Sequence, residues 1–187
     1  MLKPVKGKSL KTADGRFAIV AAQYNARYVD AMLRVAKAEF KRAGVNGIEV
    51  VRVPGSFEIP VVASRLAATQ DVPYSAIVCL GVIFQGETSH AQHIGQAVGQ
   101  ALAQLQVRSG VPIIHAVLLF ENEEQARVRC LGAQHNRGLE AARTALTMAR
   151  VMERLQRQDE EREAAARRRA LRALRKFRRQ HRAEGAP

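Results

Sequence analysis

Residues 76–90 read Ala-Ile-Val-Cys-Leu-Gly-Val-Ile-Phe-Gln-Gly-Glu-Thr-Ser-His, and this stretch decides the fold. Positions 76–80 are apolar without a break, which is typical of a strand buried on both faces of a parallel sheet. After His90, apolar residues recur at helical spacing. The stretch 81–90 is therefore predicted to be the turn from a central strand into a helix. Open α/β sheets bind their ligands at this carboxyl edge.

His90 falls in the first turn of the predicted helix. Ser89 and Gln92 have the spacing of a capping box, which would leave the Thr88 hydroxyl free. The positive helix end disfavours imidazolium, so we expect a neutral ring beside free backbone N–H groups. That combination suits proton transfer at an anionic substrate. The alternative is a surface or packing histidine, which is the commoner role for a lone histidine at a helix start.

Beside the central strand, expected over 76–84, apolar runs at 17–22 and 112–120 predict two further strands, and the largely apolar segment 48–53 predicts another. Helical patterns alternate with the strands. They begin at three predicted caps and one acidic position, which are Asn25, Ser56, Asn136 and Glu121. This alternation predicts an α/β protein, in which a parallel sheet carries helices on both faces. The last helical pattern meets no Gly or Pro before Gly185, so we expect it to continue into the C-terminal tail.

Polar or small residues follow every predicted strand, which places a candidate site at one edge of the sheet. They are Tyr24 and Asn25, Gly55 to Glu58, Gly86 to His90, and Glu121 with Asn122. A purely structural role competes for two side chains: Glu58 would compensate a helix dipole, and His115, inside the fourth apolar run, would be a satisfied core histidine. An arginine cluster downstream supplies candidates for a phosphate ligand, but spacing does not choose among Arg127, Arg129, Arg137 and Arg143.

The composition favours a cytoplasmic protein with one main domain. The 187 residues contain no apolar run of membrane-spanning length, and the polar start is unlike a secretory signal. Cys79 and Cys130 are expected to be reduced. His90 and His93 lie one turn apart like a metal pair, yet no third ligand is evident, so no metal is predicted.

The net charge of +13 is unevenly placed, and the last fifth of the chain holds nearly half of it. Residues 151–187 hold 12 basic and 6 acidic side chains, hence +6. We therefore expect an N-terminal arm at 1–15, a domain at 16–154, and a basic helical extension at 155–187. The extension is either solvated surface or a binding segment for polyanions. A rival function follows from the second choice: a non-catalytic scaffold or nucleic-acid-binding assembly.

Four segments, in order, resemble the lumazine synthase family of riboflavin synthesis. They are Gln23-Tyr24-Asn25, then Val-Pro-Gly-Ser-Phe-Glu-Ile-Pro at 53–60, then Gly81 to His90 with its Gly-x-Thr-x-His, then 121–138 from Glu-Asn-Glu-Glu-Gln-Ala to Asn-Arg-Gly. The match covers roughly 16–152 and stops before the tail. A flavin-binding electron carrier would share the fold but lack the Gly-x-Thr-x-His.

The resemblance implies a flavodoxin-like three-layer αβα sandwich with a four-stranded parallel sheet. It implies that 5-amino-6-(D-ribitylamino)uracil condenses with 3,4-dihydroxy-2-butanone 4-phosphate, through a Schiff base and loss of phosphate, to 6,7-dimethyl-8-ribityllumazine. It further implies no metal or organic cofactor, and a homo-oligomer in which the site lies between subunits. The assembly would be a pentamer or a shell of twelve pentamers (60 subunits).

The resemblance also implies residue roles. Tyr24 would stack on the pyrimidine, Glu58 would bind ribityl hydroxyls, and His90 would transfer the proton. Arg129 would hold the phosphate. The other expected ligands are Ser56, Phe57, Val82, Ile83, Phe84 and His115 for the ribitylaminouracil, and Glu87 and Thr88 for the phosphate substrate. The sequence departs from the common pattern at Tyr24 and His115, usually Phe, at Gln85, often basic, and at Ala133, often Lys.

Overall fold

The computed structural model describes residues 15–68 and 72–183, with side chains as far as Arg172. The expected N-terminal arm lies outside these residues except for Gly15. The chain divides into two compact units, with the division between Arg150 and Val151. The first unit holds the sheet and its helices, and the second is helical.

Four parallel strands form the sheet, in the order β2-β1-β3-β4. Their bounds are Phe17–Ala22 (β1), Ile48–Val53 (β2), Ala76–Phe84 (β3) and Ile113–Phe120 (β4). All four strands were therefore predicted, with β4 beginning one residue later than expected. Proline at position 112 has no N–H to donate to a ladder, which is consistent with that start.

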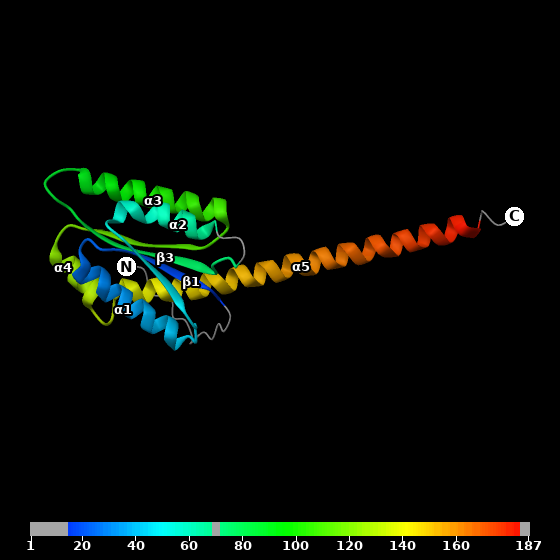
Figure 1. Ribbon diagram of the computed structural model, residues 1–187, viewed down its shortest axis with the longest axis horizontal. Coiled ribbons are helices and arrows are strands. Elements are labelled where there is room, and N and C mark those ends of the chain that lie inside the picture. Colours follow the sequence, from blue (N-terminus) through cyan, green and yellow to red (C-terminus); the bar gives the residue numbers. More distant parts are fainter. Residues whose placement is uncertain (1–14, 69–71, 184–187) are drawn as a thin grey trace. The chain divides into compact units, whose positions relative to one another are not determined.

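Helices cover both faces of the sheet, as Figure 1 shows for the first unit. One core packs β-strand residues against α1 and the start of α5, and the other packs them against α2 and α3. The elements are α1 (Ala26–Arg42), the 3-10 turn η1 (Ser56–Glu58), α2 (Ile59–Ala67), α3 (His90–Ser109), α4 (Glu123–Ala126), the π-helical turn η2 (Arg127–Leu131) and α5 (Arg137–Ala183). The α/β sandwich and the helical C-terminal region are thus confirmed.

The strand order creates a switch point between β1 and β3. The chain leaves β1 through α1 toward β2, on one side, and leaves β3 through α3 toward β4, on the other. Because α1 and α3 belong to opposite faces, the carboxyl ends of β1 and β3 lie at a topological switch point. Open α/β sheets bind their ligands at such a point.

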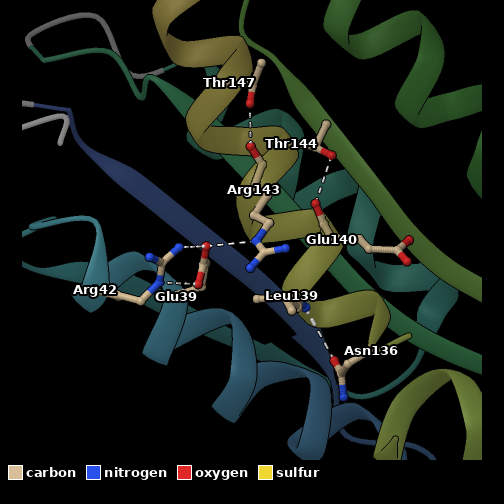
Figure 2. Close-up of polar contacts among 8 residues, drawn as sticks. All are labelled: Glu39, Arg42, Asn136, Leu139, Glu140, Arg143, Thr144 and Thr147. Atoms are coloured by element: carbon tan, nitrogen blue, oxygen red, sulfur yellow. Dashed lines mark hydrogen bonds and ion pairs between the residues drawn. The ribbon is translucent and has the colours of Figure 1, made fainter. Parts of the chain in front are cut away.

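The first turns of α5 are attached to α1 at two places. At Gly138 the backbones approach so closely that an added methyl group would overlap the backbone of Met32. Glu39 of α1 is 6% exposed and accepts hydrogen bonds from two arginines: Arg42 on its own helix, and Arg143 of α5 through Nε at 3.0 Å (Figure 2). These contacts fix the start of α5 beside α1, on the same face of the sheet.

Of the predicted caps, Asn136 is confirmed and two others are wrong. The Asn136 side chain accepts from the N–H of Gly138 at 2.9 Å and donates to Cys130 O at 2.5 Å. Asn25 precedes α1 but has φ 55 and makes no side-chain cap; its Nδ2 donates instead to Val82 O at 2.8 Å. Ser56 also makes no cap: it lies inside the turn η1, and its hydroxyl donates to and accepts from no described group. The Gly55 N–H donates to Glu58 at 2.9 Å.

The second unit is the continuation of α5 from Val151. Ion pairs one turn apart join Glu153 to Arg157 and Asp159 to Arg162. Across the described residues, no helix is long and apolar enough to cross a membrane.

Candidate active site

The end of β2 contributes Ser56, Phe57 and Glu58. Phe57 is 60% exposed, although large apolar side chains are normally buried. Ser56 is buried, and its Oγ finds no hydrogen-bond partner in the described part of the chain. This hydroxyl lies against Gly81 of β3, where an added Cβ would come within 2.5 Å of it. The turn after β2 is therefore packed directly onto β3.

The end of β1 contributes Tyr24, which is 75% exposed. Its N–H donates to Pro54 O at 3.0 Å, so the turn after β1 stays paired with the turn after β2. Tyr24 and Phe57 thus present two exposed aromatic rings from neighbouring strand ends. An exposed aromatic ring at a carboxyl edge can stack on a planar ligand.

The end of β3 lies beside the end of β1, on the side away from β2. Val82 and Ile83 are buried, whereas Phe84 is half-buried and contacts Tyr28 and Phe120 with ring centroids 5.5 and 6.4 Å away. The bond from Asn25 to Val82 O ties the ends of β1 and β3 across the switch point. Sequence reasoning missed this function of Asn25, for which a positive φ, tolerated by asparagine, is the structural sign.

The loop after β3 leads to His90, the first residue of α3. The predicted capping box is wrong, because the Ser89 side chain makes no cap bond. The Thr88 hydroxyl is not free either, since it accepts a long bond from the His90 N–H at 3.4 Å. Among the described residues, the amides of 86–89 donate no hydrogen bond. Successive unpaired amides at the start of a 20-residue helix form a favourable site for an anion.

The segment after β4 contains the arginine cluster, and its pairing separates the four members. Arg127 binds Glu124, Arg137 binds Glu140, and Arg143 binds Glu39. Arg129, in η2, is half-buried and has no ion pair within the described residues. Among the described residues, Arg129 is therefore the one arginine of the four that makes no ion pair with a carboxylate.

His115 is exposed and lies apart from the other predicted ligands. It is the third residue of β4, paired in register with Cys79, whereas the site residues of β3 pair with the end of β4. Its Nε2 lies 3.4 Å from the position of an added Cβ on Gly99 of α3. The expectation of a core histidine is wrong, and a single chain does not bring His115 to the carboxyl edge.

Metal and thiol chemistry have no evident centre in the described residues. They contain no group of three His, Cys, Asp or Glu side chains that could hold a metal ion. Burial raises the pKa of the Cys79 thiol to about 12 and that of Cys130 to about 11. Both thiols are thus protonated at neutral pH and are poor nucleophiles.

A family model and two relatives identify the family of this chain. A family model described as 6,7-dimethyl-8-ribityllumazine synthase matches residues 14–153. The 6,7-dimethyl-8-ribityllumazine synthase of Xanthomonas oryzae pv. oryzae (strain PXO99A) is 37% identical over 146 residues, which cover 77% of this chain and 94% of that protein. The enzyme of that name from Stenotrophomonas maltophilia (strain R551-3) is 38% identical over 142 residues, covering 75% of this chain and 90% of its own. The chain belongs to the 6,7-dimethyl-8-ribityllumazine synthase family.

Proposed function

We propose that this chain condenses 5-amino-6-(D-ribitylamino)uracil with 3,4-dihydroxy-2-butanone 4-phosphate to 6,7-dimethyl-8-ribityllumazine, a transferase reaction of riboflavin biosynthesis. The observation that carries the proposal is the loop 86–89, whose unpaired amides precede His90 at the start of α3. It offers donors for the phosphate of one substrate beside a group that can move a proton.

The aminouracil substrate fits the other side of the switch point. Tyr24 and Phe57 are exposed aromatic rings, and Tyr24 would stack on the pyrimidine. The backbone of Val82, Ile83 and Phe84 would meet the ring edge. Ser56 and Glu58 would bind the ribityl side of the substrate, with Glu58 accepting from hydroxyl groups while it also accepts the Gly55 N–H.

The phosphate would lie between the loop and Arg129. Glu87 and Thr88 supply backbone donors, and Arg129 supplies a charge that no described carboxylate neutralises. A guanidinium binds phosphate through two parallel hydrogen bonds, which gives orientation as well as charge. The pairing pattern therefore supports Arg129 over Arg127, Arg137 and Arg143.

In the reaction, the amine of the pyrimidine attacks the ketone and water leaves to give a Schiff base. Phosphate is then eliminated, and the ring closes by a second condensation. His90 would transfer protons to and from the oxygen and nitrogen atoms that change charge in these steps. We propose that these residues act without a metal or an organic cofactor, and that the enzyme works in the cytoplasm.

An oligomer would account for His115. This side chain is exposed and distant in register from the carboxyl edge, so it would serve the site of a neighbouring subunit. Exposed apolar residues supply contact surface, among them Leu119, Val128 and Leu131. We propose a pentamer, alone or in a 60-subunit shell, and sedimentation showing an active monomer would contradict this.

The activity is tested by incubating the purified protein with both substrates and following lumazine fluorescence. We expect product formation above the uncatalysed rate. His90→Ala protein, checked for folding by circular dichroism, is the matched control, and it should retain little of the excess rate. The same rate for both proteins and for buffer alone would refute the proposal.

A second candidate function concerns the C-terminal helix, which we propose as a binding segment for polyanions. Arg167, Arg168, Arg169 and Arg172 are all exposed on α5, and the sequence continues with five more basic residues to Arg182. Binding should be independent of base sequence and fall steeply with salt.

A filter-binding salt series with RNA, on full-length protein and on protein cut after Leu155, tests this. Equal weak binding by both would leave the charge as solvated surface, and lost catalysis after the cut would place the domain boundary elsewhere.

A further inference from the structure

Gln85 spans the loop that precedes His90. Its backbone N–H donates to Phe120 O at 2.8 Å and so extends the ladder between β3 and β4. Its side-chain Nε2 donates to two carbonyl oxygens, Gly86 O at 2.7 Å and Thr88 O at 2.8 Å. A primary amide has two N–H donors, and both are used here. One half-buried side chain therefore ties the two ends of the loop to the end of the sheet.

The two acceptors also fix the orientation of the amide group. A rotation that exchanged Nε2 and Oε1 would place the amide oxygen against two carbonyl oxygens, which is repulsive. Satisfying both carbonyls in this way takes a side chain with two N–H donors, and glutamine supplies them without a charge. Glutamine meets that requirement, and leucine or glutamate does not.

These bonds determine where the loop amides point. A trans peptide is planar, with its C=O and the following N–H on opposite sides. Since the carbonyls of Gly86 and Thr88 turn toward Gln85, the N–H groups of Glu87 and Ser89 turn away from it. Neither N–H donates a hydrogen bond within the described residues. The Gln85 side chain thus holds a donor-lined surface open at the start of α3.

We propose that Gln85 is a positioning residue for the phosphate group: it orders the loop 86–89 so that backbone amides face the anion, and it does not bind the anion itself. The inference rests on the proposed function, since it assigns the phosphate-bearing substrate to this loop. The proposal explains how neutral Gln85, which precedes Gly86, can support the binding of a phosphate dianion. Ordered backbone N–H donors would take the place of a positively charged side chain at this position.

The test is the variant Gln85→Leu, which removes both bonds and adds no charge. We expect the KM for 3,4-dihydroxy-2-butanone 4-phosphate and the inhibition constant of inorganic phosphate to rise about tenfold, the effect of about 1.4 kcal/mol of lost order. The KM for the aminouracil should change less than about twofold, because that substrate uses other strand ends. Gln92→Leu is the matched control, since it makes the same chemical change on the exposed side of α3, and it should leave all three constants unchanged.

Three kinetic results would overturn the proposal. They are unchanged phosphate constants in a folded Gln85→Leu protein, equal increases in KM for both substrates, and an equal effect of Gln92→Leu. If Gln85→Leu does not fold, Gln85→Asn is measured instead; its amide is one methylene too short to reach Thr88 O and should give a smaller increase of the same kind. Direct titration of inorganic phosphate into each protein keeps the question separate from catalysis. Weaker binding by the variant supports the loop role even if the wild-type protein makes no lumazine, and equal binding overturns it.

Discussion

Replacing Glu39 by glutamine removes the charge that joins α1 to α5. Three hydrogen bonds are affected: two from Arg42, at 2.9 and 2.6 Å, and one from Arg143 at 3.0 Å. The carboxylate is buried, but both arginines are about half exposed and can regain water. Breaking a fully buried pair costs about 3–5 kcal/mol and an exposed pair contributes below about 1 kcal/mol. We therefore expect a loss of about 2 kcal/mol, or about 4–8 °C in Tm for a unit of this size.

The loss should depend on pH in a defined direction. The hydrogen bond from Arg42 is the main cause that holds the pKa of Glu39 below its usual 4.5; the Arg143 bond lowers the pKa further, and burial opposes both. Because the unfolded chain then binds the proton more readily, the stabilisation is complete above the unfolded pKa. It disappears as pH falls through the lower folded pKa. The difference between the wild type and Glu39→Gln should therefore be constant above about pH 5 and shrink below about pH 4.

Thermal unfolding at matched protein concentration, at neutral and acid pH, measures both effects. Glu124→Gln is the control: Glu124 holds Arg127 by the same two-bond arrangement three residues away, at 2.7 and 2.7 Å, but both side chains are exposed. We expect little change in its Tm. Equal Tm values for the two variants at neutral pH would refute the reasoning, and so would a difference that persists unchanged at acid pH.

Four further results are expected. His90→Ala should lower kcat by about 10²-fold without lowering Tm, since the side chain is exposed, and an unchanged kcat in folded protein would remove His90 from the mechanism. Arg129→Ala should raise the KM of the phosphate substrate far more than that of the aminouracil, whereas Arg127→Ala should do so weakly; equal effects of the two would contradict the assignment. Gly138→Ala should cost about 3 kcal/mol and lower Tm by about 6–12 °C, because its methyl group overlaps the Met32 backbone; a Tm within about 2 °C of wild type would show that the helices separate easily. Activity should survive EDTA, and a loss that a divalent metal restores would contradict a cofactor-independent reaction.

The sheet was predictable because each strand is mostly apolar and lies between polar turns, and neighbouring residues alone carry this pattern. β1, β2 and β3 begin and end at the predicted residues. Asn136 was also predictable, since its partner, the N–H of Gly138, lies two residues away. A side-chain function can be predicted from the sequence when the hydrogen-bond partner lies only a few residues away.

Functions that depend on distant partners could not be predicted in this way. Asn25 has the sequence position of a helix cap, but Val82 O, 57 residues away, takes its side chain. Ser89 and Gln92 have the spacing of a capping box, yet the loop is held by Gln85 instead. The same limit applied to the arginines: their spacing was uninformative until the structure paired three of them with carboxylates.

The sheet order also suits a chain that is made from its N-terminus. β1 emerges first and is the partner of both β2 and β3, and β4 pairs only with β3. Each new strand therefore finds its neighbour already synthesised and can pair as soon as it emerges. The helices on the α1 face of the sheet do not follow this order. Glu39 of α1 can pair with Arg143 of α5 only after 104 more residues have been synthesised. In a nascent chain that ends before α5, this face of the sheet lacks its second helix. The first unit is therefore completed only after the start of α5 has been synthesised.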